Sequence, residues 1–155
     1  MSRSYAVTAE NIAAQGGVSA TTAQSQIISA ATVRPKLYDL MMGSPETPAD
    51  QAASWAIQRC TVANTGGSAI TPSPIEPVDP ASLCTAMNAP SMTGHTLTAG
   101  LYLLRWAQNL RATFRWVAAP GKEIVAPATA ANGLVLINPV LTGAFDVTFC
   151  LQFEE

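Results

Sequence analysis

The sequence contains few charged residues. Lysine, arginine, aspartate and glutamate make up only 12% of its 155 residues, against about 25% in a typical soluble domain. Eight basic and ten acidic residues give a net charge of −2, and the basic residues form no cluster. Nucleic-acid binding is therefore not expected, because neutralising phosphates requires concentrated positive charge. So little charge suggests a surface partly covered by other copies or by a partner, although a serine- and threonine-coated extracellular domain would have a similar composition.

Long apolar segments are also missing. The longest run, Leu101–Leu104, is far shorter than the roughly 20 residues that span a bilayer. The first residues lack the apolar core of a secretory signal, so we expect no membrane partner. The three cysteines, Cys60, Cys84 and Cys150, leave an odd count and have no CxxC or metal-ligand spacing. This pattern favours reduced cysteines in a protein made in the cytosol. Cys60 and Cys150 lie in strand-like stretches and are expected to be buried thiols.

A single histidine, His95, limits the possible mechanisms of catalysis. Zinc sites and the metal sites of jelly-roll enzymes need three or four ligands, which one histidine and scattered carboxylates do not supply. No GxSxG motif is present, and Cys84 has no basic neighbour that would activate its thiol. The acidic pair Glu76 and Asp79 lies in a proline-rich stretch without a glycosidase pattern. We therefore expect no enzyme, no catalytic residue, no metal and no cofactor.

The clearest pattern is the alternation near the C-terminal end. Five large apolar side chains between Phe145 and Phe153 alternate with other residues, which places them on one face of a strand. Turns rich in glycine and proline separate seven further strand-like stretches, at residues 4–8, 27–33, 36–42, 55–63, 97–107, 112–118 and 134–137. At most one short helix is expected, at residues 9–15 or 81–88.

The turns and strands together predict the architecture. Pro120-Gly121 suits the central positions of a type II turn, and Asn132-Gly133 is a strong hairpin signal. No repeat or shift in composition divides the chain. Residues 1–155 are therefore predicted to form one all-β domain, an antiparallel, jelly-roll-like β-sandwich of two sheets with about eight strands and little helix.

Two segments depart from the strand pattern. Residues 9–26 belong to a region rich in alanine, serine, threonine and glutamine, which we interpret as an extended N-terminal arm. Residues 64–95 contain five of the 11 prolines and are expected to stay outside the sheet interiors, because proline removes a backbone donor. This proline-rich excursion fits either an arm that contacts a neighbouring surface through Pro72, Pro74 and Pro77, or a crossover packed on its own domain.

Residues 105–116 combine three arginines with two of the three tryptophans. Strand alternation from residue 111 places Arg111 and Arg115 on the face opposite Phe114. Arginine and tryptophan are enriched in interface hot spots. We therefore interpret Arg105, Arg111 and Arg115 as candidate contacts with another subunit or a capsid. The alternative is a solvated face whose arginines pair with aspartate or glutamate.

Several stretches of the sequence resemble small virion proteins of tailed bacteriophages. They are residues 54–63 (SWAIQRCTVA), 71–80 (TPSPIEPVDP), 111–123 (RATFRWVAAPGKE), 132–134 and 153–155. The resemblance implies a jelly-roll-like capsid decoration, or cement, protein that forms a homotrimer and binds the major capsid protein. Its place would be the outer surface of the virion, after synthesis in the cytoplasm of the bacterial host. The alternative is a phage fibre or lectin-like jelly-roll module that binds carbohydrate on the host surface.

Overall fold

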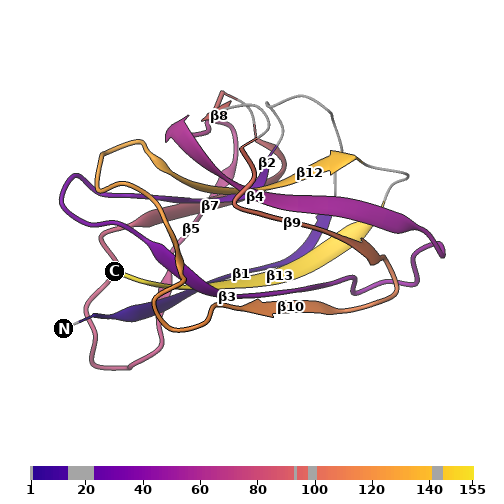
Figure 1. The fold of residues 1–155 in the computed structure, drawn as a ribbon, viewed down its shortest axis with the longest axis horizontal. Coiled ribbons are helices and arrows are strands. Elements are labelled where there is room, and N and C mark those ends of the chain that lie inside the picture. The colour runs from indigo at the N-terminus through magenta and orange to yellow at the C-terminus, as the bar shows by residue number, and fades with distance from the viewer. Residues whose placement is uncertain (1, 14–22, 93, 98–100, 141–144) are drawn as a thin grey trace.

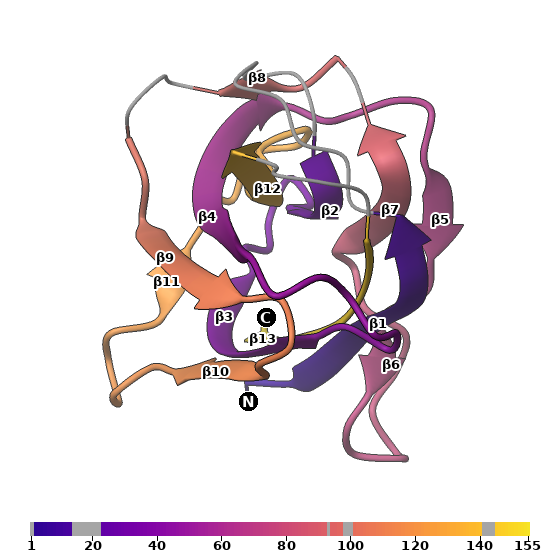
Figure 2. The ribbon, with the colours of Figure 1, turned by 90° about the vertical axis from the view of Figure 1, so that its right-hand side faces the viewer.

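The computed structural model describes residues 2–13, 23–92, 94–97, 101–140 and 145–155, and in these ranges it contains 13 strands and no helix. The strands form two antiparallel sheets that face each other (Figures 1 and 2). Sheet A has six strands in the order β10-β3-β13-β1-β6, with β11 also paired to β3: β1 (Ser4–Ala13), β3 (Lys36–Gly43), β6 (Ser73–Pro74), β10 (Phe114–Val117), β11 (Ile124–Val125) and β13 (Asp146–Glu154).

Sheet B has seven strands in the order β5-β7-β2-β12-β4-β8, with β9 also paired to β4. Its members are β2 (Ala23–Ile28), β4 (Ala52–Val62), β5 (Ser68–Ile70), β7 (Thr85–Met92), β8 (Thr96–Leu97), β9 (Leu104–Asn109) and β12 (Gly133–Val140). The predicted all-β, two-sheet antiparallel sandwich is thus confirmed. Its strand number is higher than expected because the eight-residue strand β7 and four short strands of two or three residues lie in the connections.

Eight strands form the framework of the fold. In chain order they are β1, β2, β3, β4, β9, β10, β12 and β13, and the first pairs with the last, β1 with β13. The second pairs with the seventh, the third with the sixth, and the fourth with the fifth. The chain is therefore one long antiparallel hairpin wrapped into two sheets, which is the predicted jelly-roll arrangement.

The main core lies between the two sheets. In β13 every second residue is buried, so the predicted alternation is confirmed. Phe149 and Phe153 point into the core, where the Phe153 ring stacks on Tyr5 of β1 at a centroid distance of 5.7 Å. From sheet B, Trp55 meets the edge of Phe145 at 6.1 Å.

The central strands of sheet B are buried on both faces. All six residues of β2 are buried, and Ile28, Cys60 and Val135 belong to a second apolar cluster that is separate from the main core. A strand covered on both sides shows no apolar–polar alternation. Because β2 has no such alternation, the sequence pattern misplaced this strand at residues 27–33. In the structure it comprises Ala23–Ile28.

The two turn signals have different outcomes. The Lys122 N–H donates to the Ala119 carbonyl at 2.9 Å, and Gly121 has a φ of 75°, so the type II turn at Pro120-Gly121 is confirmed. The hairpin predicted at Asn132-Gly133 is wrong. Gly133 begins β12, which pairs with β2 and β4, whereas the preceding strand β11 belongs to sheet A.

The expected helix is absent from the described residues. Residues 9–13 continue β1 and residues 85–88 lie in β7, while residues 14 and 15 are outside the described ranges. The segment that we interpreted as an N-terminal arm, residues 9–26, also belongs in part to strands. Residues 9–13 end β1 of sheet A, and residues 23–26 begin β2 of sheet B. The stretch expected as one strand at residues 97–107 is divided between β8 and β9.

The proline-rich excursion, residues 64–95, is an insertion between β4 and β9. It contributes β5 and β7 to sheet B and β6 to sheet A. The expectation that it stays outside the sheet interiors is wrong, because β7 lies between β5 and β2. The pairing of β7 with β2 shifts register between Ser25 and Ala23, opposite the part of β7 that contains Pro90, as expected where proline cannot donate to the ladder. The excursion therefore covers the edges of β1 and β2, which would otherwise invite pairing with other chains.

Candidate contact surface

A loop of the excursion projects from the sandwich. This projecting loop, residues 75–83, leaves β6 and returns toward β7, and Figure 2 shows it in pink, extending beyond the two sheets. Its apolar side chains are open to solvent: Ile75 is 45% exposed, Val78 90% and Leu83 58%. The Asp79 N–H donates to the Glu76 carbonyl and closes a turn at the tip. The loop thus exposes three apolar side chains on a sparsely charged protein.

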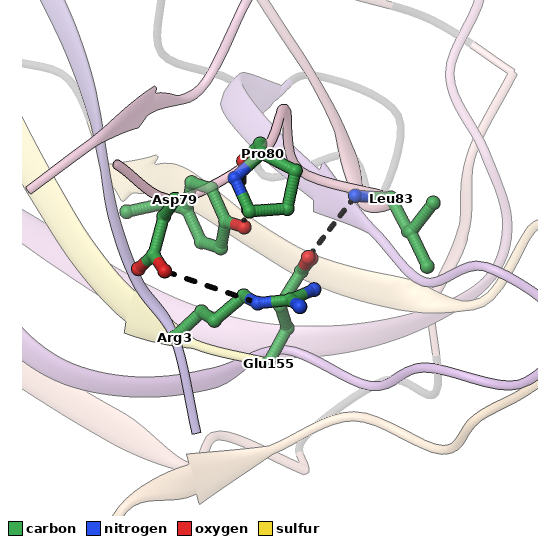
Figure 3. Close-up of polar contacts among 6 residues, drawn as sticks. Arg3, Asp79, Pro80, Leu83 and Glu155 are labelled. Carbon is green, nitrogen blue, oxygen red and sulfur yellow. Dashed lines mark hydrogen bonds and ion pairs between the residues drawn. The ribbon is translucent and has the colours of Figure 1, made fainter. Parts of the chain in front are cut away.

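The first strand holds one side of the projecting loop in place. The Ile75 N–H donates to the Ser4 carbonyl at 2.9 Å, and the buried Tyr5 hydroxyl donates to the Pro80 carbonyl at 3.0 Å. Arg3 Nε lies 3.9 Å from Asp79 Oδ1 (Figure 3). Two hydrogen bonds and an ion pair therefore fix the loop to the start of β1.

Glu155 holds the other side (Figure 3). Its carboxylate accepts hydrogen bonds from the Ser82 hydroxyl at 2.7 Å, the Leu83 N–H at 3.1 Å and the Cys84 N–H at 3.2 Å. Partial burial raises the pKa of the Glu155 carboxyl, but these hydrogen bonds favour the charged form and outweigh burial, so the pKa is lowered. Burial, together with the nearby Glu155 charge, raises the pKa of the Cys84 thiol to about 12. Cys84 is therefore an inert thiol.

Replacing Glu155 with alanine is expected to loosen the projecting loop without unfolding the domain. The amides of Leu83 and Cys84 lose their acceptor, so their hydrogen exchange, followed by mass spectrometry, should accelerate several-fold. The matched control is Glu154→Ala, because the Glu154 carboxylate accepts a hydrogen bond from Ser2, which lies outside this loop. Equal exchange of residues 82–84 in both variants would show that Glu155 does not hold the loop.

The same contact predicts a dependence on pH. The Glu155 pKa is lower in the folded protein than the usual value of 4.5, so its stabilisation of the loop is complete above pH 4.5. It is lost as the pH falls through the lowered folded value, because protonation removes the charge that the three donors contact. After correction for intrinsic rates, exchange at Leu83 should rise on acidification in the wild type and stay high in Glu155→Ala.

A cavity lies at the other end of sheet A. Its volume is about 780 Å³, and it is open to solvent on one side. Its lining is mainly apolar, with contributions from β1, β3, β10 and β13, and includes Glu10, Met41, Phe114, Arg115 and Cys150. We call it the end cavity. Its volume is within the range of about 300–1,000 Å³ that is typical of small-molecule pockets.

The three candidate arginines do not share a surface. Arg105 lies on β9 of sheet B, with its guanidinium 4.7 Å from the centre of the Tyr102 ring. Arg111 lies in the turn before β10, where its Nε donates to the Pro48 carbonyl at 3.0 Å. Strand alternation therefore does not extend to it. Arg115 lies on β10, at the rim of the end cavity.

Arg115 has an acidic partner in its own chain. Its Nη2 lies 2.6 Å from Oδ2 of Asp39 on β3, and its Nε lies 3.2 Å from Oδ1. The Asp39 side chain is only 5% exposed, whereas that of Arg115 is 60% exposed. The bidentate pair thus stabilises a buried carboxylate, which is the alternative that the sequence left open for these arginines.

Two variants separate the structural and the contact roles of Arg115. Asp39→Asn and Arg115→Ala both break the ion pair, so both should lower the melting temperature by several degrees, and Arg115→Ala more, because it leaves Asp39 buried without its partner. If Arg115 also contacts another subunit, only Arg115→Ala lowers the oligomer mass in light scattering. An unchanged mass in both variants would limit Arg115 to its ion pair.

The candidate prolines have separate positions. Pro72 is buried, whereas Pro74 in β6 and Pro77 in the projecting loop are exposed. Of the three, only Pro77 belongs to the projecting surface. Contacts of Tyr5 and Glu155 with the loop were not expected from the sequence, because more than 70 residues separate each contact pair and no local motif marks them.

His95 belongs to a group of buried polar residues that includes Asn64 and Gln26. It is 5% exposed, and its Nδ1 lies 2.5 Å from Oδ1 of Asn64. The Asn64 N–H in turn donates to Gln26 on β2 at 2.8 Å. Within the described ranges, no three histidine, cysteine or acidic residues are grouped as metal ligands, and no helix is long and apolar enough to cross a bilayer. His95 is thus a buried residue that contacts Asn64.

Comparisons with models of protein families, with curated proteins and with solved structures found no match. The resemblance to phage virion proteins therefore stays a prediction from the sequence.

Proposed function

We propose that the protein is a structural virion subunit that binds the outer surface of an assembled phage capsid and stabilises it, as a homotrimeric decoration protein. Its partners are the major capsid protein and further copies of itself. The resemblance of the sequence to small phage virion proteins motivates the proposal. The single structural observation that supports it is the projecting loop, residues 75–83, an exposed apolar surface that contacts from Tyr5 and Glu155 hold in place.

Such a loop suits binding to a repeated protein surface. Side chains that are already ordered before binding lose little conformational entropy on association. Modest contacts become strong when three linked copies bind at once. Because the subunit binds the assembled lattice and not free capsid subunits, it stabilises the lattice by mass action.

The tryptophans favour this proposal over a carbohydrate-binding module. Trp106 stacks on Phe114 with a centroid distance of 4.5 Å and an interplanar angle of 8°, and both Trp106 and Trp116 pack against the main core. Aromatic rings used in this way are not platforms for a sugar. Glycan-array binding by the isolated protein would nevertheless favour the fibre or lectin-like alternative.

The proposal is tested on virions with and without the protein. Virions that lack it should release DNA at a lower temperature or lower osmotic stress than the wild type, and the purified protein added back should restore the original release temperature. DNA release can be followed with an intercalating dye during heating. Identical release curves for the two kinds of virion, with no binding of added protein, would refute the proposed function.

A further inference from the structure

We infer that the inner face of sheet B contains a binding site for internal water, formed by the side chains of Ser25, Trp55 and Asn138. The three residues come from the neighbouring strands β2, β4 and β12, and each of them is 0% exposed. We call this group the polar site. It is independent of the proposed function, because it belongs to the fold of a single chain.

Four side-chain atoms of the polar site are unsatisfied in the part of the chain that the structure describes. Ser25 Oγ, Trp55 Nε1 and both Nδ2 and Oδ1 of Asn138 are buried without a hydrogen-bond partner there. By contrast, the indole N–H of the half-buried Trp106 donates to Gln108 Oε1 at 3.1 Å. A buried polar atom that loses its hydration and gains no partner destabilises the fold, so native proteins satisfy nearly all such atoms with protein groups or ordered water. Four of them on one face of one sheet therefore indicate a bound ligand.

Strand register brings the three side chains together. Ser25 lies opposite Leu136, which belongs to the main core. Asn138 follows Leu136 by two residues, so its side chain points to the same face. Trp55 lies beside Asn138, because the adjoining residues of β4 and β12 are paired, and it also belongs to the main core. Side chains at opposite or diagonal positions of neighbouring strands are roughly 4.5–8 Å apart, so one or two small molecules can contact all three.

The strands are irregular at the polar site. The register of β12 with β4 shifts between Ile137 and Val140, so that both Asn138 and Pro139 face Trp55. A second shift lies beside it, in the pairing of β12 with β2. A bulge of this kind interrupts the ladder of backbone hydrogen bonds. Water at the polar site therefore joins β2, β4 and β12 where their own ladder is incomplete.

The chemistry of the polar site selects water over an ion. Trp55 Nε1 and Asn138 Nδ2 can only donate, Asn138 Oδ1 can only accept, and Ser25 Oγ can do both. A cation would leave the indole N–H unpaired, and an anion would leave the amide oxygen unpaired. The three side chains also carry no formal charge that would balance a buried ion. Water is small and neutral, donates and accepts, and makes about three hydrogen bonds when it is buried.

The indole proton of Trp55 allows a direct test in solution. We expect the full chain, labelled with nitrogen-15, to show a dipolar cross-peak between this proton and water in water-selective NOE and ROE spectra. Its sign should be that of a water molecule that stays bound for longer than the protein takes to tumble. The Trp106 indole proton serves as the control in the same spectra and should show no such peak, because its partner is Gln108. Absence of the peak at Trp55 would overturn the inference.

Two variants assign the cross-peak. Ser25→Ala removes a hydroxyl proton that can relay the signal and leaves the contacts of water with Trp55 and Asn138, so the peak should remain. Asn138→Leu removes both amide contacts and fills the site with an apolar side chain, so the peak should disappear. Loss of the peak in Ser25→Ala would contradict the inference, and so would an unchanged peak in a folded Asn138→Leu variant.

A crystal structure of the wild type decides between water and a direct contact even where Asn138→Leu does not fold. Density for water should lie about 2.7–3.2 Å from polar atoms of at least two of the three residues. A direct hydrogen bond from Trp55 Nε1 to Asn138 Oδ1, with no water beside them, would refute the polar site. In crystals of Trp55→Phe the water should remain, because Ser25 and Asn138 still contact it and the variant leaves no indole donor to satisfy.

Discussion

Replacing Gly133 with alanine should lower the free energy of unfolding by about 3 kcal/mol, because an added methyl group overpacks a site that cannot yield. Gly133 lies in the middle of sheet B, opposite Ile28 on one side and Cys60 on the other. A β-carbon there would lie 2.2 Å from the Ile27 carbonyl oxygen and 3.0 Å from the Ile28 α-carbon. Both are backbone atoms, so the strands β2 and β12 would have to separate.

The matched control is Gly121→Ala. Gly121 has no atom within 4 Å of an added β-carbon, but its φ of 75° is one that residues with a side chain rarely adopt. Its replacement should cost about 1 kcal/mol through backbone strain alone. Urea unfolding of the two variants, followed by circular dichroism, compares the costs. A Gly133→Ala variant no less stable than Gly121→Ala would mean that sheet B accommodates the methyl group.

Truncating Trp55 should have a similarly large effect. Its side chain is 0% exposed in the main core and meets Phe145 edge to face. Trp55→Ala removes the largest fully buried side chain of the chain's described part and should lower the free energy of unfolding by about 3–5 kcal/mol. The shift in the urea midpoint, at constant slope, measures this loss.

Trp55→Phe separates packing from hydrogen bonding. The Trp55 indole N–H is buried without a hydrogen-bond partner among the described residues, and a buried donor without a partner costs about 1–3 kcal/mol. Phenylalanine keeps most of the aromatic volume and removes this donor. The variant should therefore unfold within about 1 kcal/mol of the wild type. A loss equal to that of Trp55→Ala would contradict this assignment.

Local patterns predicted the parts of the fold that depend on neighbouring residues. The alternation around Phe149 identified β13, and Pro120-Gly121 identified a type II turn. Both depend only on residues that follow one another in the chain. The hairpin prediction at Asn132-Gly133 failed because glycine occurs both in turns and where two strands approach closely. Gly133 allows the close approach of β2 and does not form a hairpin turn.

Features that depend on distant residues were not predictable. Residues 85–88 have little strand propensity, but pairing with β2 and β5 places them in a sheet, so tertiary context overrides propensity. The candidate arginine Arg115 was identified, whereas its partner Asp39 lies 76 residues away. The projecting loop was expected only as part of a proline-rich excursion. The sequence pattern did not indicate that Tyr5 and Glu155 would hold it.

The pairing of the first strand with the last also determines when the domain can form. In sheet A, β13 lies between β3 and β1, so these two early strands have no common neighbour until residues 146–154 have left the ribosome. Contacts between residues so far apart in sequence form slowly, because a long loop must close before any pairing stabilises it. The sandwich should therefore form only after β13 has been synthesised, on a millisecond-to-second scale. Chains that do not yet contain β13 should then be unable to recruit partner subunits.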